Sequence, residues 1–473
     1  MSTRRTVLTG LAASAIAAPA LAQGPRKALD VIVLGAGLAG LHAARLLEAE
    51  GMTVQVYEAS NRAGGRMLTL DDLPGTPESG GSQVGGGYAR IRATCDELGV
   101  GLRDLFGDEA LPDGLLCLKD GAIRTRDWAS YPNNPFPEAY RRTPPTAALF
   151  RVASAQPNPF VALDDWIRAP AEADVSADAF LAARGFNEEA RRLSDIAINA
   201  NAATTYSMVN VYRSLLLFGQ EAGLGRTQGI AGGSMRLPEA MARSLKTPVR
   251  FGARATAIRV TRSGVEVRFA GGRPARASFL IAAIPLPVLR RMRVEAPFAP
   301  AQREAIQRAA YTQIIQAHVE SSRPWWEADG LPAGMWVDGP IERVFAQSDA
   351  TGKPTGMQVV WMNGLGAMAL AGRSDEDIAA LVTGELARVR PASKGLTTVR
   401  RIVRWTEANP LAGGGYMHYE PGQVGRWAEG LPAPAGRLYL AGEHLSRLHT
   451  GMEGAMESAE NAALALLEAA APA

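Results

Sequence analysis

The sequence predicts an α/β protein that begins its fold with a Rossmann-like strand–helix–strand unit, and two observations carry this prediction. Residues 29–34 read LDVIVL, an apolar run typical of a buried parallel strand. They lead into residues 35–40, GAGLAG, which have the G-x-G-x-x-G spacing of a dinucleotide-binding turn. A helix should follow, and a second strand over 53–57 should end at Glu58.

Each position in this turn has a physical role. Gly35 permits a tight turn, Gly37 lets the backbone approach a pyrophosphate, and Gly40 lets the helix pack close to the strand. Leu38 and Ala39 begin the helix, whose free N–H groups and partial positive charge favour phosphate. We therefore expect these five residues to contact a dinucleotide.

Glu58 follows Gly40 by 18 residues, close to the usual spacing for an acid that holds a ribose diol. An acid at this place disfavours a 2′-phosphate, which argues against NADP as the tightly held ligand. Both FAD and NAD fit this fingerprint.

The composition limits the function classes. The 473 residues indicate two or three domains, and the formal net charge of +3 argues against nucleic acid as a partner. Only two cysteines occur, Cys95 and Cys117, which excludes a disulfide framework. The spacings of the five histidines fit no zinc motif, so we expect no metal site.

The N-terminus reads as an export signal. Arg4-Arg5 forms a twin-arginine pattern, residues 11–18 are apolar, and Ala20-Leu21-Ala22 suits signal peptidase. The apolar stretch is too short for a stable membrane span. We expect residues 1–22 to be a twin-arginine signal peptide cleaved near Ala22, which sends an already folded, cofactor-loaded protein to the periplasm.

Three further segments resemble the flavin amine oxidases, a family that includes monoamine, polyamine and L-amino acid oxidases. Residues 59–66, ASNRAGGR, resemble the second diphosphate-contacting segment of that family, and residues 437–443 and 451–459 resemble its C-terminal strand and helix. The resemblance implies FAD as the cofactor, with Arg66 neutralising the diphosphate and the C-terminal helix pointing its N-terminus at the flavin. The resemblance also implies that six further residues contact the cofactor: Ala59, Gly65, Gly442, Glu443, Gly451 and Met452.

The middle of the chain extends the resemblance. Residues 229–238 resemble the family's glycine-rich turn, Ala255 falls at a backbone contact to adenine, and the segment around Gly81 and Ser82 is a further cofactor contact. The implied fold interleaves a Rossmann-like FAD-binding domain (29–87, 226–288 and 403–470) with an α+β substrate-binding domain (88–225 and 289–402).

The resemblance also places the chemistry. Trp405 and residues 413–416 resemble the strand that passes the flavin ring, and Tyr416 matches the first aromatic residue of the substrate cage. Gly415 stands where monoamine oxidases carry a flavin-bonded cysteine, so the FAD should be non-covalent. The second cage aromatic is replaced by Gly451 or, with a shift of one residue, by Met452. His449 lies nearby and could fill the space or hydrogen-bond a substrate.

Two more departures concern reoxidation and substrate. Arg290 is the match for the family lysine that holds a water against the flavin, so oxygen could react slowly. Gln83 stands where L-amino acid oxidases carry the arginine that binds the α-carboxylate, and an amino acid substrate would need another arginine, such as Arg90 or Arg213.

The resemblance implies oxidation of a small-molecule amine by hydride transfer to the flavin. The imine product would hydrolyse to an aldehyde or ketone, and O2, giving H2O2, or another periplasmic acceptor would reoxidise the flavin. Three alternatives stay open: an L-amino acid oxidase, a desaturase-like FAD oxidoreductase, and a non-catalytic flavoprotein partner. The sequence gives no information on oligomeric state.

Overall fold

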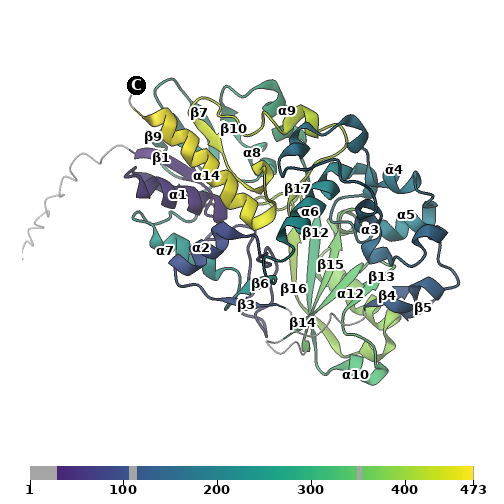
Figure 1. The fold of residues 1–473 in the computed structure, drawn as a ribbon. Coiled ribbons are helices and arrows are strands. Elements are labelled where there is room, and N and C mark those ends of the chain that lie inside the picture. The colour runs from purple at the N-terminus through teal and green to yellow at the C-terminus, as the bar shows by residue number, and fades with distance from the viewer. Residues whose placement is uncertain (1–28, 106–113, 349–353, 472–473) are drawn as a thin grey trace, which may run out of the picture.

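The computed structural model describes residues 29–105, 114–348 and 354–471, so the expected signal peptide, residues 1–22, lies outside the described residues. Two sheets organise the chain (Figure 1). Long segments of the chain pass from one sheet to the other and back, which gives the interleaved α/β arrangement that the sequence predicts.

The first sheet contains the predicted dinucleotide unit. Strand β1 (Leu29–Leu34) lies parallel to β2 (Val54–Tyr57) on one side and to β9 (Ala275–Ala282) on the other. Strand β18 (Leu438–Leu440) also pairs with β9 in parallel. The sheet therefore joins three stretches that are more than a hundred residues apart in sequence.

Two helices cover one face of this sheet. In α1 (Leu38–Ala49) the residues Leu41, Ala44 and Leu47 recur on one face, and all are fully buried. Helix α14 (Gly451–Ala470) runs beside α1, as the purple and yellow helices in Figure 1 show. Both helices begin at the same edge of the sheet, where the parallel strands end.

The second sheet has the strand order β16-β12-β15-β14-β13-β4-β5. Its bounds are β4 (Leu115–Leu118), β5 (Gly121–Arg124), β12 (Ile314–Ser321), β13 (Met335–Val337), β14 (Arg343–Ser348), β15 (Pro354–Asn363) and β16 (Thr397–Trp405).

The two faces of the second sheet differ in chemistry. Ile315, Ala317 and Val319 alternate along β12 and pack against α12 (Asp375–Val389) on one face. Gln316, between them, points to the opposite face, where it contacts Ser79 of the chain that follows β2. The polar side of this sheet therefore faces the first domain.

The first part of the expected substrate-binding domain, residues 88–225, contains the helices α2 (Ala89–Glu97), α3 (Ala148–Ser154), α4 (Ala177–Ala182), α5 (Glu188–Asp195) and α6 (Met208–Glu221). Two strands cross the expected domain limits. Strand β10 (Arg293–Glu295) pairs with β7 (Ala255–Val260) in the first sheet, beyond residue 288, and β16 belongs to the second sheet up to Trp405, beyond residue 402.

No helix in the described part of the chain is long and apolar enough to cross a membrane.

Candidate functional site

The glycine turn after β1 forms an open cradle. Gly35 has φ +101°, and a Cβ placed on Gly40 would lie 1.9 Å from the Gly35 carbonyl oxygen, so neither position accommodates a side chain without rearrangement. A Cβ on Gly37, in contrast, would meet only the Gly64 carbonyl oxygen, at 4.0 Å. Leu38 then starts α1 with its N–H groups directed at this opening. The backbone fits a pyrophosphate group here.

Glu58 completes the cradle at the end of β2. Its two carboxylate oxygens each accept a backbone hydrogen bond of 2.8 Å, one from Ala36 and one from Ser60. The side chain is therefore fixed beside the turn, and Ala59 follows it directly in the chain. The Glu58 carboxylate suits the ribose of a dinucleotide, because the ribose hydroxyls can donate to its remaining acceptor sites.

The predicted adenine region lies next to this acid. The backbone of Glu58 exchanges hydrogen bonds with Arg250 and Ala253, of 2.9 and 2.8 Å, and Ala255 opens β7 two residues later. The structure thus brings Ala255 to the same side of the sheet as Glu58, as expected of a shared nucleotide site.

Arg66 joins three distant segments. Its Nη1 donates to the carbonyl of Gly415 and to the carboxylate of Glu443, both at 2.8 Å. Gly65 lies against the phosphate turn, since a Cβ on it would be 3.5 Å from the Cα of Gly37. Arg66 therefore connects the cradle to the segment before Tyr416, with Glu443 as the neighbouring countercharge.

The second glycine segment meets the C-terminal helix. A Cβ on Gly81 would lie 3.0 Å from the side chain of Met452, and Ser82 follows at the same edge. Trp405 donates from its indole nitrogen to the carbonyl of Ser79 at 2.6 Å. The predicted cofactor residues Gly81, Met452 and Trp405 are thereby gathered beside Arg66, whose carbonyl accepts from the Gly81 amide at 3.1 Å.

The turn after β18 is built for close contact. Gly442 has φ +148° and its amide donates to Ser458 Oγ at 2.8 Å. A Cβ on Gly442 would lie 2.4 Å from the ring of His444. Burial lowers the pKa of His444 to about 3, with a smaller contribution from Arg66, so this imidazole is neutral at pH 7.

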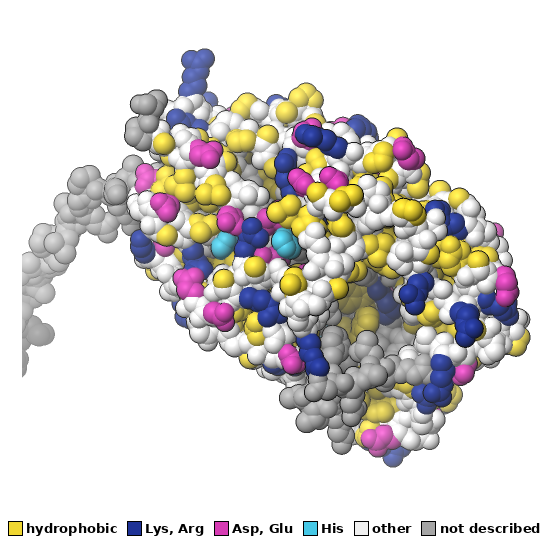
Figure 2. Space-filling view, in the orientation of Figure 1, with side chains coloured by type: hydrophobic (Ala, Val, Ile, Leu, Met, Phe, Trp, Pro, Cys, Tyr) yellow, Lys and Arg dark blue, Asp and Glu magenta, His cyan; other side chains and the backbone are white. Residues whose placement is uncertain are grey.

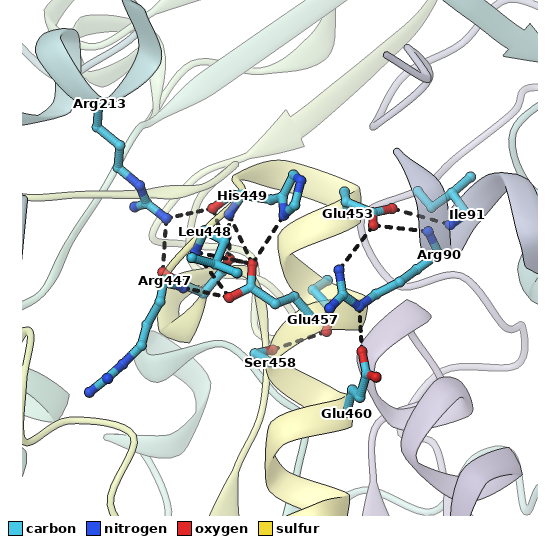
Figure 3. Close-up of polar contacts among 12 residues, drawn as sticks. Arg90, Ile91, Arg213, Arg447, Leu448, His449, Glu453, Glu457, Ser458 and Glu460 are labelled. Carbon is cyan, nitrogen blue, oxygen red and sulfur yellow. Dashed lines mark hydrogen bonds and ion pairs between the residues drawn. The ribbon is translucent and has the colours of Figure 1, made fainter. Parts of the chain in front are cut away.

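Figure 3 shows how the loop before α14 is held. The buried carboxylate of Glu457 accepts hydrogen bonds from the backbone amides of Arg447, Leu448 and His449 and from Ser446 Oγ, over 2.5–3.2 Å. Burial alone would raise the pKa of this carboxyl, but contacts from His449, Ser446 and the amides lower it to about 2. An ionised carboxylate therefore fixes the helix start.

The same view locates His449 and Arg213. His449 Nδ1 lies 3.4 Å from Glu457 Oε2, so this predicted catalytic side chain is directed at the loop's own anchor. Arg213 donates to the carbonyls of Ser446 and His449. Gly451 begins the helix, exposed and with φ +58°. The sequence analysis did not select Glu457, whose one signal is that it and Glu453, four residues apart, stand among the apolar residues of one helix face.

Tyr416 lies beside the polar face of the second sheet. Thr312 and the Gly415–Tyr416 segment exchange backbone hydrogen bonds of 2.8 and 2.9 Å, and Tyr416, like Trp361, packs against the buried cluster of Ile314, Trp405 and Ala412. Burial raises the pKa of the Tyr416 hydroxyl to about 12, against smaller opposing effects of Arg343 and Thr312. This phenol stays neutral and cannot serve as a base at pH 7.

Arg290 occupies a different position. It follows the short helix α8 (Leu286–Leu289), and its Nη2 donates to the carbonyl of Ala309 at 2.7 Å. Burial lowers the pKa of this guanidinium. No hydrogen bond connects Arg290 to Tyr416 or Trp405 among the residues that the structure describes.

The polar face of the sheet also carries residues that the sequence analysis did not select. Ser79 Oγ lies 2.5 Å from Gln316 Oε1 and 3.0 Å from His318 Nε2. Arg343 and Trp361 are cross-strand neighbours on the same face as Gln316. The only sequence signal for the strand residues among these was the alternation of polar and apolar side chains along each strand. In the described ranges, no group of three or more His, Cys, Asp or Glu side chains could hold a metal ion.

Comparisons with known proteins find relatives among the flavin-containing amine oxidases and the L-amino-acid oxidases. The chain is 26% identical over 468 residues to human flavin-containing amine oxidase B (93% of this chain, 86% of that protein) and 24% identical over 459 residues to an L-amino-acid oxidase of Demansia vestigiata (92% and 86%).

Solved structures show the same fold. Cyclohexylamine oxidase from Brevibacterium oxydans superposes with a TM-score of 0.76 at 21% identity, covering 94% of this chain and 99% of its own. Wild-type putrescine oxidase bound to putrescine gives 0.72 at 21% identity, with 93% and 99% covered. Residues 38–467 match the family model of flavin containing amine oxidoreductases, and the chain belongs to this family of flavin-dependent enzymes.

Proposed function

We propose that this protein oxidises a small-molecule amine at its C–N bond, with FAD as the bound cofactor, to an imine that hydrolyses to an aldehyde or ketone. The family and the named substrates of two neighbours, cyclohexylamine and putrescine, support an amine substrate. One observation carries the proposal to this chain. Arg66, beside the dinucleotide cradle, donates to the Gly415 carbonyl, and the Gly415–Tyr416 segment bonds Thr312 next to β12, which supports a position of Tyr416 near both the cradle and the polar sheet face.

The chain itself supplies binding and desolvation. FAD, when bound, supplies the acceptor for the two electrons and the hydrogen that leave the carbon next to the amine nitrogen. Tyr416 offers an aromatic ring that orients a neutral amine. Burial lowers the pKa of His318 and of His418 to about 4, so both imidazoles are uncharged at pH 7. Buried surroundings of this kind disfavour a charged group, which favours the neutral form of a substrate amine over its ammonium form.

We further propose that the FAD is not covalently attached. Gly415 carries no thiol, and a Cβ at this position would lie 2.5 Å from Ile314 Cδ1. The two cysteines are buried elsewhere, Cys95 on α2 and Cys117 on β4. Acid precipitation of the holoenzyme should release all of the yellow chromophore into the filtrate. Colour that stays with the precipitated protein would overturn this proposal.

Export by the twin-arginine route, cleavage near Ala22 and reoxidation by O2 or another periplasmic acceptor are part of the same proposal, supported by the Arg4-Arg5 pattern. Mass spectrometry of the protein secreted to the periplasm should give an N-terminus near Gln23. Admitting air to the reduced enzyme should restore the flavin band and release H2O2 if oxygen is the acceptor.

The decisive experiment is anaerobic mixing of the holoenzyme with amines, polyamines and amino acids while the flavin band is followed. One class should bleach it, at a rate that rises with pH as the substrate amine loses its proton. A pH-independent rate for a simple alkylamine would contradict oxidation of the neutral amine. A protein whose flavin no amine bleaches would instead be a desaturase-like enzyme or a non-catalytic partner.

A further inference from the structure

Three side chains form a row across the polar face of the second sheet. Trp361 on β15 pairs in register with Arg343 on β14 and with Gln316 on β12. Residues in such register share one face, so the three side chains stand side by side. The Arg343 guanidinium lies 5.8 Å from the centre of the Trp361 ring. Figure 2 shows a hollow in the part of the surface that lies over the second sheet.

The guanidinium of Arg343 is only partly satisfied. Its Nη1 donates to Asn199 Oδ1 at 2.8 Å, which fixes the plane of the group. Its Nε and Nη2 are buried and have no hydrogen-bond partner among the described residues. These two nitrogens form one edge of the guanidinium, and their hydrogens point the same way. That edge is the fork that binds both oxygens of a carboxylate.

No carboxylate of the described chain fills this fork. The adjacent Glu342 turns its side chain to the Asn363 amide, 2.8 Å away, and none of the described ion pairs includes Arg343. An unpaired buried cation is costly unless a ligand completes it. Among the described arginines, only Arg343 has both Nε and Nη2 buried without partners.

The other arginines considered from sequence are occupied. Arg90 is bonded to Glu453 and Glu460. Arg213 stacks 4.2 Å from the Trp166 ring centre, and its Nη2 donates to two backbone carbonyls, so only its Nε is buried without a partner among the described residues and no free fork remains. Gln83 is exposed. Trp361, whose ring faces the Arg343 guanidinium, packs against the same buried cluster as Tyr416, so the fork and the Tyr416 ring lie in one region of the molecule.

We propose that Nε and Nη2 of Arg343 bind a carboxylate of the substrate, so that the substrate is an amine that also carries an acid group. Trp361 Nε1, likewise buried and unpartnered, is available as a further donor to the same group. This inference rests on the proposed amine oxidation and narrows its substrate to amino acids. The carboxylate can be the α-carboxylate or one at the far end of the molecule, and the two sources are separable by experiment.

The test compares matched substrate pairs in the holoenzyme. An amino acid is paired with the amine that lacks its α-carboxylate, and glutamate and aspartate are paired with glutamine and asparagine. Wild type should oxidise the acid member of one pair faster, and the pair affected identifies the carboxylate. Arg343→Met should lower kcat/KM for that acid by about 10- to 100-fold, the usual effect of losing a hydrogen bond to a charged group, and leave its neutral partner unchanged.

Two controls make the result specific. Arg343→Lys keeps the charge but loses the fork, and should recover only part of the lost rate. Arg400→Met removes an exposed arginine of β16 that pairs with Glu320 at 3.2 Å, and should behave as wild type. Loss of both members of a pair in parallel, or no preference of wild type for any acid, would overturn the inference.

A binding measurement separates this inference from the proposed function. 3-Phenylpropionate, a carboxylate without an amine, is titrated into the yellow protein while the flavin difference spectrum and the melting temperature are recorded. Wild type should bind it, and Arg343→Met should bind it about 10- to 100-fold more weakly. If no amine bleaches the flavin, the proposed oxidation fails but this titration still decides the role of Arg343. Equal binding by both proteins contradicts the carboxylate site.

Discussion

Glu457 anchors the start of α14, and its replacement by glutamine tests whether a buried charge holds this end of the flavin site. The pKa of the carboxyl falls from its usual 4.5 to about 2, and its side chain is only 2% exposed. The difference, 4.5 minus 2, corresponds to about 3 kcal/mol of folding free energy at neutral pH. For a chain of this length, that free energy lowers the melting temperature by about 3 °C.

The pH dependence follows from the direction of the shift. Because the folded-state pKa lies below that of the unfolded chain, the stabilisation is complete well above pH 4.5 and is lost as the pH falls toward 2. The difference in free energy of unfolding between wild type and Glu457→Gln should therefore shrink to about half near pH 3.

The assay is thermal melting of the two holoenzymes across this pH range, followed by flavin fluorescence. Glu460→Gln is the matched control, because Glu460 lies on the same helix but is 38% exposed and pairs with Arg90. It should change the free energy of unfolding by less than about 1 kcal/mol. A Glu457→Gln effect as small as that of the control, or one that is the same at pH 3 and pH 7, would refute the reasoning.

Three further outcomes are expected. Gly40→Ala should abolish FAD retention, because its Cβ would meet the Gly35 carbonyl at 1.9 Å. The measurement is the ratio of 450 nm to 280 nm absorbance. The control is Gly384→Ala, which should retain FAD fully because a Cβ there meets nothing within 4 Å. Tyr416→Phe keeps the ring and should hold kcat/KM for an amine within about tenfold of wild type. Tyr416→Ala removes the ring that orients the amine and should lower kcat/KM about 100-fold; an unchanged rate would exclude Tyr416 from substrate positioning.

The dinucleotide half of the site could be predicted because its signals are local. The strand at residues 29–34, the glycine turn and Glu58 follow one another in sequence, and the structure places them in that order around one cradle. The helix predicted to begin at Gly451 also begins there. In such segments the residues that act together are neighbours along the chain, so their spacing in the sequence is enough to predict their arrangement in space.

His449 and Arg290 show the limit of that reasoning. His449 was selected because it stands close to the start of the C-terminal helix, and Arg290 because it matches the family lysine in sequence. The side chain of His449 is directed at Glu457, and that of Arg290 at the carbonyl of Ala309. The position of a residue in a loop does not fix where its side chain points, because the direction depends on partners from distant segments.

The substrate half of the site depends on register between strands. Arg343 and Gln316 are 27 positions apart and come together only because each pairs with Trp361 on the strand between them. A shift of one residue in either pairing would turn its side chain to the face packed on α12. No local motif encodes that register, since the long-range packing of Ile315, Ala317 and Val319 against α12 selects it. The proposed role of Arg343 is therefore a consequence of strand register rather than of a sequence motif. If Arg343 binds the substrate carboxylate as proposed, a change in this pairing would alter substrate preference while the dinucleotide motifs stayed intact.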